Sequence, residues 1–233
     1  MAISPSPQRD RDVTLWLLAC AAGCVDAVSY LALGQVFVAN MTGNTVLLGI
    51  ATVEREAGAT LRVALSLAGF VCGAAAGTVM LERATSLRTG RAVFRVLVCQ
   101  LLLMAIAAWY WRAQTTPLAH ADTLVPLLSV AMGLQTVAAR RLDRFGIATT
   151  FITGSITALV SRAISGMRGT PAPAAPAAES ASGAGVLAVI WGLYVGGAAA
   201  GAWLARSAPA VAMLVPLALV LCAAMLIGRD RSD

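Results

Sequence analysis

The sequence predicts an all-α polytopic membrane protein with about six spanning helices, two short re-entrant or broken helices, and two inverted repeats. Three observations predict this fold class. Of 233 residues, 59% are hydrophobic and only 12% are charged, whereas about a quarter of the residues in soluble domains are charged. The apolar residues form runs long enough to cross a bilayer. The second half of the chain also repeats motifs of the first.

Eight apolar runs follow one another along the chain. Six have the length that a ~30 Å hydrocarbon core requires at 1.5 Å per residue, and they cover residues 13–33, 61–81, 92–111, 121–139, 184–205 and 209–227. The other two, 36–53 and 145–163, are unusual because they contain polar and flexible residues. The first run is too long for a signal-peptide core, so we expect a retained helix.

The two unusual runs resemble each other and have similar neighbours. MTGN at 41–44 matches ITGS at 152–155, and the preceding run carries an aligned glycine in each case, Gly23 and Gly133. The run after each copy carries the pentapeptide GAAAG, at 73–77 and at 197–201. Three matches in the same order predict two homologous halves, residues 1–115 and 116–233.

The arginines indicate how the halves are oriented, since all 17 basic residues are arginine. If all eight runs crossed the membrane, nine arginines would face the cytoplasm and eight the outside. If 36–53 and 145–163 are re-entrant, 13 of the 17 face the cytoplasm, as the positive-inside rule expects. Each half then has three spans, which makes the repeats inverted and puts both termini inside. Eight crossings with parallel repeats remain the alternative.

Chain length agrees with a re-entrant path. From Gly34 to Met41 an extended chain covers at most ~26 Å, and a helix from Thr42 to Val53 returns ~18 Å. Non-helical backbone at membrane depth persists only inside protein or beside a wet cavity. Thr and Asn are suited to start a helix. We therefore predict two half-helix N-termini that meet near the midplane, at 42–44 and 153–155.

Converging half-helix N-termini form the usual binding site of secondary transporters. Their free N–H groups suit an anion or a strong hydrogen-bond acceptor, so we predict a small polar or anionic solute as the ligand. The candidate substrate-binding residues are Asp26, Asn40, Thr42, Gly43, Asn44, Thr45, Gln135, Thr149, Thr150, Thr153, Gly154, Ser155 and Thr157. A Pro/Ala-rich stretch, 170–183, is typical of a flexible cytoplasmic linker.

Asp26 is the sharpest single candidate because it lies about two thirds of the way along the first span, where a carboxylate is costly. Its repeat counterpart is Thr136, beside Gln135. One interpretation is a proton-coupling or substrate-contacting group. The structural alternative is a buried carboxylate that pairs with Ser29, Tyr30 or a backbone N–H.

Other polar and aromatic residues have simpler interpretations. Gln100 is expected to join helices. An interfacial belt is expected to account for the larger aromatic residues, most of which lie near span ends; they are Trp16, Trp109, Tyr110, Trp111, Trp191, Tyr194 and Trp203. A lone His120 and five cysteines without a CxxC pair predict no metal and no cofactor. The net charge of +6 reflects orientation in the bilayer, and no nucleic-acid partner is expected.

Three other function classes stay open beside transport. An intramembrane enzyme would need a nucleophile with a base, or metal ligands, within the membrane. Ser, Thr and Asp26 are available, but no His, Glu, Lys or Arg is expected to accompany them there, so we predict no enzyme. A scaffold or regulatory protein would use the polar segments for packing only. A channel would also accommodate re-entrant half-helices, but its flux would not saturate.

The stretches GCVDAVSYLALGQVFVANMTGNTVLLGIA, GLQTVAARR and ATTFITGSITALVS resemble the YoaK-like bacterial family of domain of unknown function 1275. The resemblance covers nearly the whole chain, and the stretch VFVANMTGN is fairly specific to the family. It implies a protein of the bacterial inner membrane without an established activity. It transfers no catalytic or binding residues.

Overall fold

The computed structural model describes residues 7–83, 89–113, 116–142, 164 and 181–229. These residues form α1 (Pro7–Ala32), α2 (Met41–Val53), α3 (Ala57–Glu82), α4 (Thr89–Ala113), the 3-10 turn η2 (Pro117–His120), α5 (Ala121–Leu142), α7 (Ala181–Ser207), the 3-10 turn η4 (Pro209–Val211) and α8 (Leu214–Arg229). Six of the described helices are long and apolar enough to span a membrane, and α2 is a shorter apolar helix. The predicted all-α membrane fold is confirmed.

Some predictions fall outside the described residues. They are the second unusual run, 145–163, and the linker 170–183 except for its last three residues, which begin α7.

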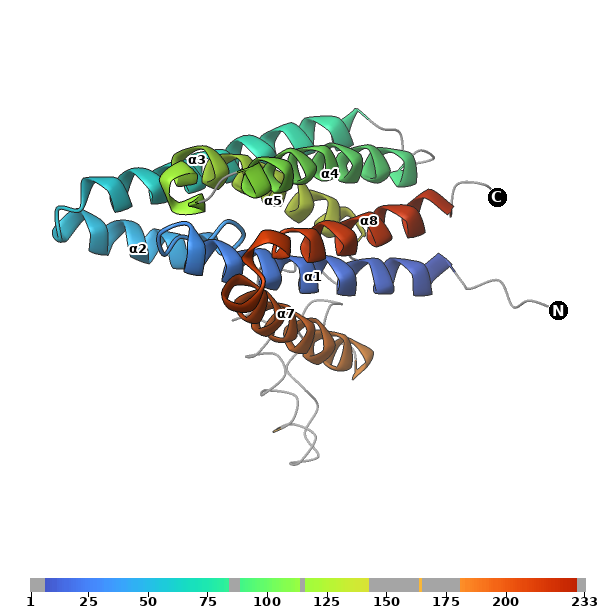
Figure 1. The fold of residues 1–233 in the computed structure, drawn as a ribbon. Helices are drawn as coiled ribbons and strands as arrows, with labels where there is room; N and C mark the ends of the chain where they lie inside the picture. The colour runs from blue at the N-terminus through green and yellow to red at the C-terminus, as the bar shows by residue number, and fades with distance from the viewer. Residues whose placement is uncertain (1–6, 84–88, 114–115, 143–163, 165–180, 230–233) are drawn as a thin grey trace.

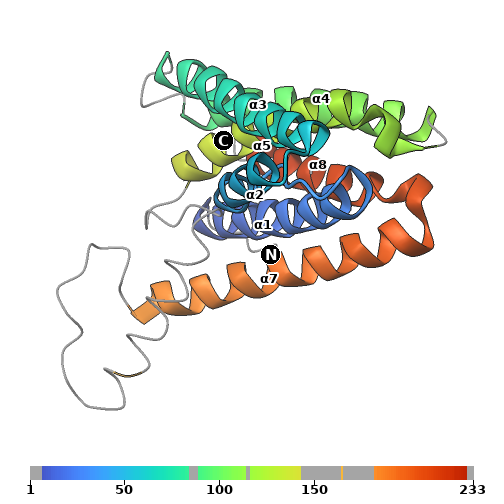
Figure 2. The same cartoon turned by 90° about the vertical axis from the view of Figure 1, so that its left-hand side faces the viewer.

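Successive spanning helices run in alternating directions (Figure 1). As a result four helix termini lie at the same end of the bundle: the starts of α1 and α7 and the ends of α5 and α8. Figure 2 shows α3 and α7 on opposite outer sides, with α1, α5 and α8 between them. The outer positions of α3 and α7 leave these two helices the least buried of the six spans.

Glycine lets α1 and α7 touch backbone to backbone. A Cβ atom on Gly23 would collide with the carbonyl oxygen of Tyr194, and one on Gly197 would collide with that of Cys20. Gly201 lies against Cys24 in the same way. Within a bilayer the hydrophobic effect does not drive helices together, so spanning helices associate by close packing. Small residues at this spacing allow that packing.

The α3–α5 pair repeats this pattern position by position. A Cβ on Gly133 would collide with the carbonyl oxygen of Phe70, and one on Gly73 with that of Val130. The alignment of Gly23 with Gly133, and of 73–77 with 197–201, pairs each of these contacts with its counterpart in α1–α7. Within each pair the two helices run parallel, since residues four apart on one helix meet residues four apart, in the same order, on the other. The two pairs run in opposite directions (Figure 1).

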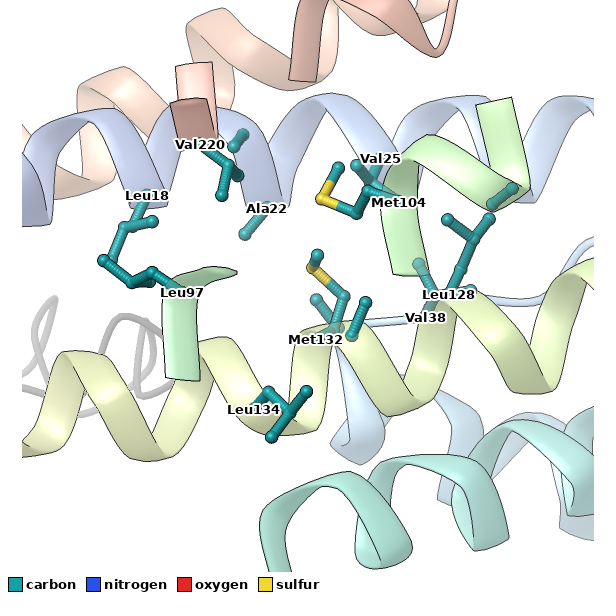
Figure 3. Packing of buried hydrophobic residues seen from close by; sticks show 14 of the residues in the cluster. Leu18, Ala22, Val25, Val38, Leu97, Met104, Leu128, Met132, Leu134 and Val220 are labelled. Atoms are coloured by element: carbon teal, nitrogen blue, oxygen red, sulfur yellow. The ribbon is translucent and has the colours of Figure 1, made fainter. Parts of the chain in front are cut away.

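An apolar core joins the inner helices. Figure 3 shows Leu18 and Val25 of α1 near Leu97 and Met104 of α4, Leu128 and Met132 of α5, and Val220 of α8. Val38, from the non-helical segment between α1 and α2, belongs to the same cluster and is completely buried. That segment is therefore held inside the protein, where its backbone groups need partners.

Candidate functional site

The chain turns back on itself at the end of α1. Gly34 and Gln35 have φ angles of 87° and 58°, and the N–H of Gln35 donates to the carbonyl oxygen of Tyr30 at 3.0 Å. A left-handed pair of this kind ends a helix and reverses the chain, and glycine adopts it without steric cost. The segment 33–40 thus re-enters the bundle.

The carboxylate of Asp26 binds the backbone of the segment 33–40. The backbone N–H groups of Val38 and Ala39 donate to Oδ1 of Asp26 at 2.9 and 2.7 Å. Because Asp26 precedes Ala32, the last residue of α1, by six positions, the chain has descended ~9 Å at 1.5 Å per residue. The first short run is a broken helix as predicted, but its descent is shallower than the ~26 Å that a fully extended segment could reach, because the turn and the bonds to Asp26 shorten it.

The second carboxylate oxygen of Asp26 has a partner on another helix. The hydroxyl of Tyr194, on α7, donates to Oδ2 at 2.6 Å. Asp26 is only 2% exposed and is the only buried carboxylate among the described residues. Three uncharged donors therefore satisfy it. The structure thus matches the backbone-pairing alternative; Ser29 donates to the main-chain carbonyl of Asp26 instead of its carboxylate.

Asn44 forms a second polar cluster with the same segment. Its Oδ1 accepts from the N–H of Phe37 at 3.0 Å, and its Nδ2 donates to the carbonyl of the same residue at 2.7 Å. Nδ2 also donates to Ser66 of α3 at 2.9 Å, and Ser66 shares a 2.8 Å bond with Ser129 of α5. Asn44 is completely buried. Its amide thus replaces the missing helical partners of Phe37.

The remaining first-copy candidates lie around the start of α2. Oδ1 of Asn40 accepts from the N–H of Gly43 at 3.1 Å and caps the helix, as Asn at this position does in general. Thr42 and Thr45 are exposed, and the Thr45 hydroxyl donates back to the carbonyl of Met41. These two threonines point away from the Asp26 and Asn44 clusters, toward the outer surface of α2.

Gln135 belongs to a different place in the core. Its Nε2 donates to the carbonyl of Leu18 in α1, and its Oε1 accepts from Nε2 of Gln100 in α4 at 2.6 Å. Both side chains are almost completely buried, so Gln100 joins helices as expected. The structure does not bring Gln135 to Asp26. The second-copy candidates Thr149, Thr150, Thr153, Gly154, Ser155 and Thr157 lie outside the described residues.

Sequence reasoning missed three residues of the polar clusters around the segment: Tyr194, Ser66 and Ser129. Tyr194 was assigned to the interfacial belt, which was wrong, because its hydroxyl lies on Asp26. Its position in the middle of the run 184–205 was the available signal, since a tyrosine hydroxyl that deep needs a polar partner. Ser66 and Ser129 carry no sequence signal, because serine is common between spanning helices.

The residues that could hold a metal ion do not gather in the described part of the chain: it contains no group of three His, Cys, Asp or Glu side chains. What the arrangement does chemically is to hold a non-helical segment inside a bundle. Asp26 and Asn44 supply acceptors and donors to four backbone groups of 37–39.

Comparison with known proteins agrees with the resemblance described above. The UPF0700 transmembrane protein YoaK of Bacillus subtilis is 36% identical over 152 residues, which cover 64% of this chain and 66% of that protein, just under two thirds of its length. No solved structure matches. A family model described as a protein of unknown function, DUF1275, matches residues 14–226. The chain is therefore a multi-pass integral membrane protein that belongs to the DUF1275 family.

Proposed function

We propose that this protein is a secondary transporter of a small polar or anionic solute, built from two inverted repeats, 1–115 and 116–233. The observation that carries the proposal is the equivalence of two helix pairs. Gly23 meets the Tyr194 carbonyl in α1–α7, and Gly133 meets the aligned Phe70 carbonyl in α5–α3. An odd number of spans in each repeat makes related halves inverted, which is the common plan of secondary transporters.

The broken helix supports the same function. In transporters the solute binds where unwound chain and half-helix ends meet inside the bundle. Here α2 begins inside the protein next to Asp26, after a buried non-helical segment. The alignment assigns the corresponding half-helix of the second repeat to 153–155, and the solute would lie between the two.

The bond between Asp26 and Tyr194 suggests how the halves are coupled. Asp26 belongs to the first repeat and Tyr194 to the second, so the 2.6 Å bond joins them. Protonation of the carboxylate would remove the charge that strengthens this bond and so weaken the contact. We therefore assign Asp26 to the coupling of transport to a proton, with Tyr194 as its partner.

The proposal also covers the membrane in which the protein lies and the absence of enzymatic activity. The arginine distribution supports a bacterial cytoplasmic membrane with both termini in the cytoplasm, and the relative from Bacillus subtilis is described as a transmembrane protein. We propose no enzymatic activity. Both carboxylate oxygens of Asp26 accept hydrogen bonds from the protein itself, and the donors, two backbone N–H groups and the Tyr194 hydroxyl, supply no general base beside it.

Flux in proteoliposomes tests the proposal. Purified protein is reconstituted with an internal pH dye, and nitrate, lactate or phosphate is added outside. We expect one of these anions to produce a saturable pH change that Asp26→Asn abolishes. A linear, unsaturated flux would favour a channel. If no anion moves while the wild type is folded, the scaffold alternative is favoured.

A further inference from the structure

The turn between α2 and α3 contains a pocket that is separate from the Asp26 cluster. Its volume is about 280 Å³. Apolar walls come from Leu47, Ile50 and Val63, and charged groups come from Arg62, Glu54 and Glu56. The arginine distribution predicts that this end of the bundle faces outside the cytoplasm.

Arg62 has no partner among the described residues. Its Nε atom is buried without a hydrogen bond. A buried donor of a charged group that lacks an acceptor is costly. Glu54 and Glu56 line the same pocket and are exposed, yet neither makes an ion pair with Arg62. The cation is thus left available for a ligand.

Glycine keeps the guanidinium in this place. A Cβ on Gly34 would lie 2.6 Å from Nε of Arg62, and one on Gly58 would lie 3.4 Å from Nη1. The guanidinium therefore lies between the turn after α1 and the first turn of α3. A larger residue at Gly34 would displace it, and the positive φ there excludes most other residues as well.

We propose that this pocket binds a small zwitterion in which an oxyanion and an ammonium group are a few ångström apart. The oxyanion pairs with Arg62, whose planar donors suit carboxylate and phosphate. The ammonium group pairs with Glu54 or Glu56, and an apolar portion rests on Leu47 and Val63. A simple anion suits the pocket less well, because two carboxylates would repel it. The proposal does not depend on transport.

Two sources supply this chemistry, a free amino acid and the headgroup of an ethanolamine lipid. The test uses the full chain in phosphatidylcholine nanodiscs, with calorimetric titration of L-leucine, of 4-methylpentanoate, which lacks the ammonium group, and of 3-methylbutan-1-amine, which lacks the carboxylate. We expect leucine to bind, and each truncated probe to bind about tenfold more weakly or worse, as loss of one charge-assisted hydrogen bond implies.

Variants locate the binding. Arg62→Gln and the pair Glu54→Gln with Glu56→Gln should each weaken leucine binding about tenfold. Arg55→Gln, between the two glutamates but not in the pocket wall, should leave it unchanged. If Arg62→Gln does not fold, the exposed glutamate variants still decide the question.

The lipid source is tested by adding phosphatidylethanolamine to the discs. If the lipid headgroup is the occupant, it raises the unfolding temperature of wild type but not of Arg62→Gln, and it competes with leucine. The proposal is overturned if 4-methylpentanoate binds as tightly as leucine, if Arg62→Gln binds like wild type, or if neither leucine nor the ethanolamine lipid has any effect.

Discussion

The hydroxyl of Tyr194 donates a 2.6 Å hydrogen bond to Oδ2 of Asp26, across the close contact of α1 and α7. The other oxygen of the same carboxylate holds the backbone of Val38 and Ala39. One buried side chain thus fixes both a neighbouring helix and the non-helical segment that precedes α2. Changes at this carboxylate should affect both.

Tyr194→Phe removes one donor and leaves Oδ2 of Asp26 buried without a partner. We expect a loss of ~1–3 kcal/mol in the free energy of unfolding, the usual cost of an unsatisfied buried group. Equilibrium unfolding of the purified protein in detergent micelles measures it. Val195→Ala, at an exposed position on the same helix, is the control. A Tyr194→Phe variant as stable as wild type would mean that the bond does not stabilise the fold.

Asp26→Asn should be tolerated better than Asp26→Leu. The asparagine Oδ1 can still accept from the N–H groups of Val38 and Ala39, and its amide can donate to the Tyr194 oxygen. Leucine leaves two buried N–H groups unpaired, each of which costs ~1–3 kcal/mol. The same unfolding measurement compares the two variants. Equal losses would show that the hydrogen bonds to the segment carry no stability.

Asn44→Ala should release the segment 33–40. It removes both hydrogen bonds to Phe37 and one to Ser66, so the Phe37 N–H should exchange with solvent faster, as measured by hydrogen–deuterium exchange. Asn40→Ala removes only the cap of α2, worth ~1 kcal/mol. Thr45→Ala, at an exposed position, is the matched control, and protection equal in Asn44→Ala and Thr45→Ala would contradict the assignment.

Gly23→Ala and Gly133→Ala should destabilise the protein to similar extents. Each added methyl group would meet a backbone carbonyl, of Tyr194 and of Phe70 respectively, and overpacking typically costs ~1–3 kcal/mol. At Gly192 a Cβ would meet nothing within 4 Å, so Gly192→Ala should be neutral. Unequal effects of the first two variants in unfolding experiments would argue against equivalent helix pairs.

Topology is testable with single cysteines in a background without the five native ones. We expect a cysteine at Glu56 to be labelled from outside, and cysteines at Gly90, Arg144 and Gly169 to be labelled from the cytoplasm. A membrane-impermeant maleimide on intact and permeabilised cells measures this. Labelling of Arg144 and Gly169 from opposite sides would mean that the intervening run crosses, and the inverted repeats would then be wrong.

Local signals were enough for much of the fold. The length of the apolar runs predicted the six spans, since a hydrocarbon core sets the length of a crossing helix. The polar residues at 42–44 predicted a helix start within one residue of Met41, where α2 begins, but only the structure identifies Asn40 as the cap. The aligned glycines pointed to close packing, although not to the partner of each glycine.

The tertiary structure alone decided which distant groups meet. Asp26 and Tyr194 are 168 positions apart, and a sequence does not indicate which hydroxyl will face a carboxylate across a helix contact. The same holds for Gln100 with Gln135 and for Ser66 with Ser129. By itself the sequence determined the spans, the approximate start of the short helix and the small residues that allow close packing, because these depend on near neighbours and on the bilayer. The pairing of buried polar groups depends on the rotation and depth of whole helices, which only their packing sets.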